Sequence, residues 1–232
     1  MNQSFVYALH KTGVYAALDI VRDYGTRSTS GRRTSFSQFG EDKFLSDYFR
    51  DWQGVYIDVG GNHPINLSNT YLLYRRGWKG LVVEPIRRLY EKHRRIRPRD
   101  VQVNAAAGSA DGQLTFYEVI PSVLSTCETA VFEELLSSGK AILLNKYTVP
   151  VVTVAELHRE RLQSCPVSLL SVDTEGHDMD VLCGVDWEAM HPEVVICEAN
   201  TDSRQEEITR FLSERGYKRA AQTGCNLIFS LK

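Results

Sequence analysis

The chain has 232 residues, of which 43% are hydrophobic and 24% are charged, and its formal net charge at pH 7 is −2. This length and composition predict a globular protein with one sizeable core. An isoelectric point near 6.3 gives no electrostatic case for nucleic-acid binding, so we expect no nucleic-acid partner.

The cysteines and the N-terminal region indicate where the protein works. The five cysteines are far apart and include no C-x-x-C pair, which predicts free thiols in a reducing compartment. The apolar stretch 5–21 contains His10, Lys11 and Asp19 and ends without a cleavage site, unlike a signal peptide. No uncharged run approaches the roughly 18 apolar residues of a membrane span. We therefore expect a cytoplasmic protein without a transmembrane segment.

Residues 1–35 are predicted to form an amphipathic helix and a linker in front of a main domain, 36–232. Apolar residues from Phe5 to Val21 recur at helical spacing, and a stretch rich in Ser, Thr, Arg and Gly follows. The helix is expected to pack on the core or on a second subunit, with docking to a membrane surface as the alternative. A dimer formed through it is therefore possible, and the oligomeric state stays open.

The next feature is a short apolar strand, Val55-Tyr56-Ile57, that runs into Asp58-Val59-Gly60-Gly61-Asn62. The two glycines allow a positive φ and a close backbone approach to a ligand, because neither has a Cβ. The following predicted strand ends at Glu84, 24 positions after Gly60, where a carboxylate can accept two hydrogen bonds from a ribose diol. This layout predicts a nucleotide-binding βαβ unit. A tight turn followed by a solvated glutamate is the alternative.

The glycine turn lacks the features that bind a phosphate chain. Asn62-His63-Pro64 stands where a G-x-G-x-x-G fingerprint would continue, and there is no Walker A loop. The sequence therefore predicts an adenosine ligand without a phosphate chain, for which S-adenosylmethionine is the obvious candidate. An NAD-dependent oxidoreductase is a weaker alternative, because NAD carries a pyrophosphate.

Short apolar runs and helical stretches alternate from Phe36 onward, which predicts an α/β fold with a doubly wound, mostly parallel sheet. The last two strands flank Thr223-Gly224 and are predicted to form an antiparallel hairpin. The predicted helices are 68–76 and 86–96, and the predicted strands are 80–84, 101–106, 113–118, 148–152, 167–173, 194–198, 217–222 and 226–230.

A cluster of basic residues accompanies the second of these helices. We interpret it as the solvated face of the helix and its exit, since charge runs usually face water. An anionic glycan, a lipid headgroup or an acidic protein would be the partner if the cluster binds one. Its members are Arg87, Arg88, Lys92, Arg94, Arg95, Arg97 and Arg99.

An insertion at 122–147 separates the strands 113–118 and 148–152. It follows a strand end and has a mixed polar character, so we predict a lid or a wall of the acceptor site. The alternative is an ordinary connecting helix, 128–136, packed on the edge of the sheet.

Six ordered blocks of the sequence carry a family resemblance. They are Ser37-Gln38-Phe39-Gly40-Glu41-Asp42, the stretch 56–64, Ser68-Asn69-Thr70, Gly77-Trp78-Lys79-Gly80, Val83-Glu84-Pro85 and the stretch 171–178. Together they resemble the FkbM family of S-adenosylmethionine-dependent methyltransferases, from about residue 36 to the C-terminus. The resemblance implies a class I methyltransferase fold, which is Rossmann-like with a seven-stranded sheet, and an acceptor from natural-product or surface-glycan chemistry.

The candidate cofactor site follows from the rule that ligands bind at the carboxyl ends of the strands in such sheets. Gly60 is expected under the methionine part, Glu84 on the ribose and the turn 104–106 beside the adenine. The resemblance adds Gln38 and Ser68-Asn69 near the amino acid end of the cofactor. The full predicted set is Gln38, Asp58, Gly60, Asn62, Ser68, Asn69, Glu84, Pro85, Asn104, Ala105, Ala106 and Asp173.

The segment 173–178 carries the candidates for catalysis. Methyl transfer to a hydroxyl needs an aligned acceptor and a nearby base. We predict His177 as the base, because an imidazole titrates near neutral pH, with Asp173 at the reactive end of the cofactor and Glu175 orienting the base or the substrate. Alternatively, Asp173, Glu175 and Asp178 hold Mg²⁺, or Asp178 simply caps the next helix.

These observations predict an S-adenosylmethionine-dependent methyltransferase that acts on an oxygen of a sugar, a glycan or a polyketide-like natural product. The acceptor class rests on the resemblance alone. A noncatalytic Rossmann-like binding module remains the alternative from a different class.

Overall fold

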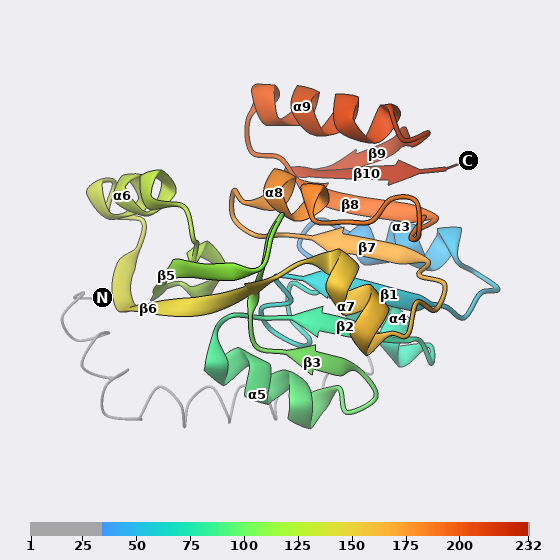
Figure 1. Cartoon of the computed structure of the whole chain (residues 1–232), viewed down its shortest axis with the longest axis horizontal. Coiled ribbons are helices and arrows are strands. Elements are labelled where there is room, and N and C mark those ends of the chain that lie inside the picture. The colour runs from blue at the N-terminus through green and yellow to red at the C-terminus, as the bar shows by residue number, and fades with distance from the viewer. Residues whose placement is uncertain (1–33, 232) are drawn as a thin grey trace.

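The computed structural model describes residues 34–231, which contain two β-sheets. The larger sheet has seven strands in the order β3-β2-β1-β7-β8-β10-β9 (Figure 1). Strand β10 is antiparallel to both of its neighbours, and the other adjacent pairs are parallel. The predicted mostly parallel sheet with a C-terminal hairpin is therefore confirmed. Its strands are β1 (Val55–Val59), β2 (Lys79–Val83), β3 (Val101–Val103), β7 (Leu169–Val172), β8 (Val194–Glu198), β9 (Lys218–Thr223) and β10 (Asn226–Ser230).

Helices cover both faces of this sheet, which explains why its central strands are almost wholly apolar. Successive side chains of a strand point to opposite faces, so Ile57 of β1 packs in one core and Tyr56 in the other. The first core includes side chains of α7 (Val154–Arg161), α8 (Asp178–Cys183) and α9 (Asp202–Ser213). The second includes side chains of α3 (Glu41–Tyr48) and α4 (Tyr71–Arg75).

Helix α4 is shorter than the predicted helix 68–76. Its first backbone amide, from Tyr71, donates to Ser68 Oγ at 3.1 Å. The side chains of Asn69 and Thr70 bond instead to Ser171 and Asp58, on strands β7 and β1. Tertiary hydrogen bonds thus hold residues 68–70 outside the helix.

The smaller sheet has three strands in the order β4-β6-β5. Strand β5 (Gly112–Ile120) pairs antiparallel with β6 (Ile142–Val152), and β4 (Ala106–Ala107) pairs parallel with β6. The prediction of one strand over 101–106 was wrong, because the chain leaves β3 after Val103 and enters the other sheet. The predicted strands 113–118 and 148–152 exist but lie in this sheet, which projects beyond the main one (Figure 1).

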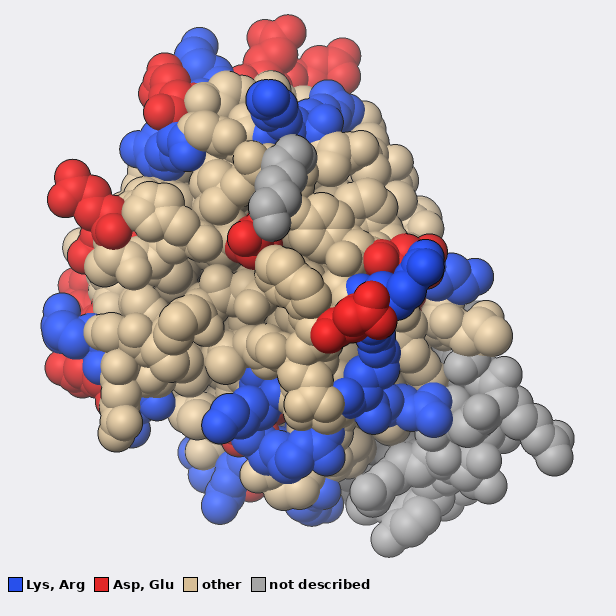
Figure 2. All heavy atoms as spheres, turned by 90° about the vertical axis from the view of Figure 1, so that its right-hand side faces the viewer, with Lys and Arg blue, Asp and Glu red and all other residues tan. Residues whose placement is uncertain are grey.

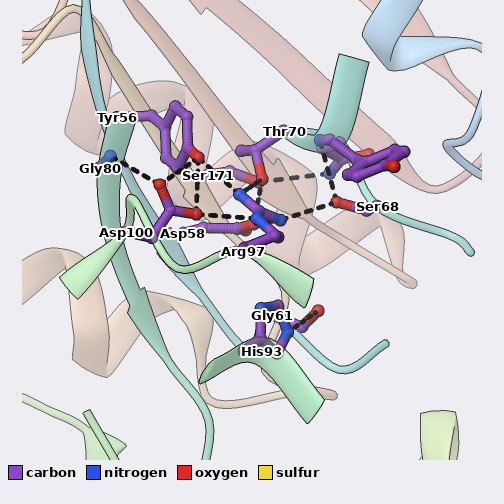
Figure 3. A network of polar contacts seen from close by, with 12 residues as sticks. Tyr56, Asp58, Gly61, Ser68, Thr70, Gly80, His93, Arg97, Asp100 and Ser171 are labelled. Atoms are coloured by element: carbon purple, nitrogen blue, oxygen red, sulfur yellow. Dashed lines mark hydrogen bonds and ion pairs between the residues drawn. The ribbon is translucent and has the colours of Figure 1, made fainter. Parts of the chain in front are cut away.

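The basic cluster is not wholly solvated, contrary to our interpretation of the sequence, because Arg97 is buried. It lies at the end of α5 (Arg87–Ile96) with 0% exposure, and Lys92 is also buried. The Arg97 guanidinium donates to Asp100 Oδ2 and to Tyr56 Oη, both at 2.7 Å (Figure 3). These partners, with Asp58 at 3.9 Å, hold the pKa of Arg97 above its usual range despite burial, which by itself lowers it. Arg97 therefore joins α5 to β1 from inside the fold.

The outer side chains of the cluster remain at the surface, as predicted. The side chains of Arg87 and Arg94 are 71% and 56% exposed, and both pair with Glu91 on the same helix. Figure 2, which views the right-hand side of Figure 1, shows basic side chains gathered toward the bottom and a largely uncharged centre. Over residues 34–231, none of the helices has the length and apolar character that crossing a membrane requires. The predicted N-terminal helix lies outside the described residues.

Candidate active site

A pocket opens at the carboxyl ends of β1, β2 and β7. The smaller sheet and the segment at its tip supply one wall, with Phe116, Ser122 and Cys127. Ten of the predicted site residues line the pocket: Gln38, Gly60, Asn62, Glu84, Pro85, Ala105, Ala106, Asp173, Glu175 and His177.

The floor of the pocket is the turn after β1. Gly60 has a φ of 78°, and a Cβ on it would lie 1.8 Å from the carbonyl oxygen of Asp173. The backbone amides of Gly60 and Gly61 donate to Val83 O at 3.0 and 3.2 Å. Only glycine fits at position 60, because any other residue would push apart the ends of β1 and β7.

Glu84 lies at the end of β2 with 3% exposure. Its two carboxylate oxygens accept hydrogen bonds from the backbone amides of Asn62 and Ile86, each at 2.7 Å. Burial raises its pKa to about 7, although these amides oppose the shift. Each carboxylate oxygen can accept a further hydrogen bond. Glu84 can therefore support the glycine turn and bind a diol at once.

Beyond Glu84, the pocket becomes an apolar slot. Pro85, Ile86, Ala106 and Phe116 line it. Asn104 does not line the pocket, but its Nδ2 donates to the carbonyl oxygens of Glu84 and Pro85 at 2.8 and 2.9 Å. Its side chain thus fixes the backbone at the slot, whose apolar lining suits an aromatic base.

At the other end of the pocket, three carboxylates meet beside β7. Oxygens of Asp173, Glu175 and Glu198 all lie within 4.8 Å of one another. Burial, reinforced by the charge of Glu198, raises the pKa of Asp173 well above its usual range and that of Glu175 to about 8. Glu198 ends β8, so the sheet brings it to two residues that follow β7. The cluster can hold protons near neutral pH.

Asp178 is not part of that group. Its Oδ2 accepts from Thr174 N at 3.3 Å and from Thr174 Oγ1 at 2.8 Å, and its Oδ1 accepts from Glu198 N at 3.1 Å. Burial and the neighbouring Glu198 raise its pKa to about 7. Asp178 therefore ties the loop after β7 to β8 rather than capping α8, and it does not complete the proposed magnesium set.

Both ring nitrogens of His177 face carboxylates. Nδ1 lies 2.9 Å from Glu128 Oε1 in a hydrogen bond, and Nε2 lies 2.9 Å from Asp180 Oδ2 without good alignment for one. A neutral imidazole donates from only one nitrogen, whereas an imidazolium donates from both. His177 thus connects the N-terminal end of α6 (Thr129–Ser137) with α8.

The insertion 122–147 forms part of the pocket wall. It contains a short helix, η2 (Ser122–Leu124), then α6, then the first half of β6. Asn62 Nδ2 donates to Ser122 O at 3.3 Å, and Thr126 Oγ1 donates to Glu175 O at 3.1 Å. Helix α6 has no buried residue, but its Phe132 ring stacks on Tyr117 of the edge strand β5 with 4.1 Å between centroids, so a connecting helix packed on the sheet edge stays an alternative. Its role as an acceptor lid stays a prediction.

Three non-glycine residues with positive φ line the pocket. They are Asn62 at 39°, Leu67 at 58° and Glu175 at 52°. Elsewhere in the described chain, only Gln163 and Ser164 share this property. Strained backbone of this kind concentrates at ligand sites. Leu67 was absent from the predicted set, because no local sequence pattern marks a strained leucine.

Asp58, Ser68 and Asn69 do not line the pocket. Asp58 follows the alternation of β1 to the opposite face from Val59, where its Oδ2 accepts from Thr70 Oγ1 at 2.5 Å (Figure 3). Ser68 Oγ lies 3.4 Å from Nη1 of Arg97 in the same network. This network, buried behind the pocket, supports the loop that follows the glycine turn. A direct contact of these three with the cofactor stays a prediction.

Residues 58–219 match the methyltransferase FkbM domain family, and this match spans more than half of the chain. The chain belongs to the FkbM methyltransferase family. Membership in the FkbM family implies S-adenosylmethionine as the methyl donor. The pocket fits that group, since it joins an apolar slot, a carboxylate at Glu84 that can accept further hydrogen bonds, and a glycine floor that any Cβ would fill.

This FkbM protein has a low similarity to solved structures of other methyltransferases. One is a Pyrococcus horikoshii protein assigned as an RNA methyltransferase, with 13% identity over 82% of each chain and a TM-score of 0.41. Another is precorrin-6Y C5,15-methyltransferase from Geobacter metallireducens, with 10% identity over 81% of this chain and 84% of that one and a TM-score of 0.42. Comparison with curated proteins gives no match.

Proposed function

We propose that this FkbM protein transfers a methyl group from S-adenosylmethionine to a hydroxyl oxygen of a sugar, a glycan or a polyketide-like natural product. The observation that carries the proposal is the pairing, in one pocket, of a diol acceptor at Glu84 with the proton-holding carboxylates Asp173 and Glu175. When bound, the cofactor supplies an electrophilic methyl group on a sulfonium sulfur.

The two ends of the pocket bind different parts of the cofactor. Glu84 accepts hydrogen bonds from the ribose hydroxyls, and the slot beyond it, with Ile86, Ala106 and Phe116, takes the adenine. Gly60 leaves room for the amino acid end, which also meets Gln38. In this orientation, the sulfonium lies toward Asp173, and its positive charge favours the ionised form of this buried carboxyl.

The acceptor hydroxyl must lose its proton as its oxygen takes the methyl group. Glu175 is well suited to receive the proton, because a base works best when its pKa is near the working pH, and burial raises the pKa of Glu175 to about 8. His177 remains a candidate base. Its two carboxylate contacts make it equally suited to hold the loop 173–178 against the insertion.

The first test is a calorimetric titration of the purified protein with S-adenosylmethionine, S-adenosylhomocysteine and NAD, with and without Mg²⁺. We expect the first two to bind and NAD not to bind. NAD binding would favour an oxidoreductase. Binding of none would favour a noncatalytic module.

A second test separates oxygen from nitrogen acceptors. The protein is incubated with labelled S-adenosylmethionine and either alkyl glucosides or the matching alkyl glucosaminides, with polyketide alcohols assayed in parallel. Methyl ethers are the expected products. A methylated amine from the glucosaminides alone would contradict O-methylation.

A further inference from the structure

Leu67 combines three properties at the mouth of the pocket. It lines the pocket, the residue is 49% exposed, and its φ is 58°. A bulky residue in the left-handed region is strained, and an exposed leucine gains little from the hydrophobic effect. Core packing therefore does not explain why a leucine occupies this position.

A second exposed apolar side chain, Phe39, stands on the neighbouring segment. It is 45% exposed and follows Gln38, which lines the same pocket. The two segments run side by side, because Ser68 N donates to Phe36 O at 3.1 Å. The Phe39 ring rests on the turn between β9 and β10, where a Cβ on Gly224 would lie 2.5 Å from it. The Phe39 ring is therefore held in place by its contact with this turn.

Several polar groups of the adjoining pocket wall already have partners within the chain. Asn62 Nδ2 donates to Ser122 O, and Ser125 Oγ accepts from Val119 N at 3.1 Å. Val123 adds apolar surface to the same wall. A polyhydroxylated ring needs many hydrogen-bond partners when it leaves water, whereas an apolar skeleton does not.

We propose that Leu67 and Phe39 form an apolar platform that binds the hydrophobic part of the methyl acceptor beside its reactive hydroxyl. The inference rests on the proposed function and narrows it to an alcohol with an apolar skeleton, in preference to a free sugar. Leu67 itself lines the pocket, and so does Gln38 beside Phe39, which assigns the methyl acceptor as the occupant of the platform.

The test is a calorimetric titration with a homologous series of 1-alkanols, from ethanol to octanol, and with D-glucose. It is run on the protein alone and on the protein saturated with S-adenosylhomocysteine. Affinity is expected to rise with each added methylene, and glucose is expected to bind more weakly than octanol. Equal binding of glucose and octanol, or affinity independent of chain length, would overturn the proposal.

Leu67→Asn is the decisive variant, because asparagine tolerates the left-handed region and removes the apolar surface. Octanol binding is expected to weaken several-fold, while the melting temperature does not fall. Phe39→Ser is expected to act in the same direction. Val101→Thr, which changes an exposed apolar residue at the opposite edge of the sheet, should leave octanol binding unchanged.

Unaltered octanol binding in both Leu67→Asn and Phe39→Ser would show that the platform does not exist. The titration without nucleotide keeps this result separate from the proposed function. If S-adenosylhomocysteine fails to bind while the alkanol dependence persists, the methyltransferase proposal fails and the apolar platform stands.

Discussion

The carbonyl oxygen of Asp173 occupies the space in which a Cβ of residue 60 would stand, at 1.8 Å from its position. Strands β1 and β7 can therefore end side by side only with glycine at this point. The short distance between these two strand ends sets how close the pocket floor lies to the loop 173–178.

Gly60→Ala is expected to lower the free energy of unfolding by about 2–5 kcal/mol, from left-handed strain and overpacking together. Urea unfolding of the two proteins measures the difference. Gly112→Ala is the control, because no heavy atom lies within 4 Å of the added methyl. Equal stability of the wild type and Gly60→Ala would refute the close approach of Gly60 to the Asp173 carbonyl oxygen.

Glu84→Gln is expected to weaken S-adenosylhomocysteine binding by about 1–3 kcal/mol, or roughly 5- to 150-fold, because a charged acceptor becomes a neutral one with a single oxygen. Calorimetry measures the change. Exposed Glu160→Gln serves as a control for the loss of one charge. Undiminished affinity in Glu84→Gln would remove the ribose assignment.

Stability of the protein without ligand is expected to fall between pH 6.5 and about 8. Folding raises the pKa of Glu84 and Asp178 to about 7 and that of Glu175 to about 8, from 4.5, 3.8 and 4.5. A raised carboxyl pKa stabilises the folded state at low pH, and this contribution is lost as pH rises through the folded value.

Buried His93 acts in the opposite direction but in a lower window. Burial lowers its pKa from 6.5 to about 3, so its contribution is complete above pH 6.5 and is lost only as pH falls. Melting temperatures across pH 6.5–8.5 therefore test the carboxyl effect free of the His93 contribution. Stability that rises over this interval would count against the three shifts, and Glu175→Gln should flatten the decline.

His177→Ala is expected to release the insertion from the loop after β7, because it removes the contacts to Glu128 and Asp180. Hydrogen exchange of the amides in 122–137 should accelerate about tenfold or more, as for a loss of about 1.5–3 kcal/mol of charged hydrogen bonding. Replacement of the exposed His191 by Ala is the control. Unchanged exchange would show that His177 does not hold the insertion against the loop after β7, and would leave His177 free for catalysis.

Arg97→Met is expected to cost about 3–5 kcal/mol of stability, since it leaves buried Asp100 without the positive charge that lies 2.7 Å from it. Arg94→Met removes a surface pair to Glu91 and should cost under about 0.5 kcal/mol. Denaturant unfolding compares the two. Similar small losses in both variants would show that the buried network adds little.

The amino-acid sequence by itself determined the features that depend on neighbours along the chain. The run from Val55 to Asn62 predicted a strand and a glycine turn, and the alternation of short apolar segments predicted a parallel sheet. Because the carboxyl ends of parallel strands meet at one edge, Glu84 and the segment 173–178 could be assigned to one pocket before their positions were known.

Only the tertiary structure decided the features that depend on distant neighbours. Nothing local marks Arg97 as buried, since its partners Tyr56 and Thr70 lie 41 and 27 positions earlier in the chain. Glu198 joins Asp173 and Glu175 because β7 and β8 lie side by side. The exposure and strain of Leu67 likewise arise from the path of the loop around it. Long-range packing sets burial, charge environment and backbone strain, which local patterns do not encode.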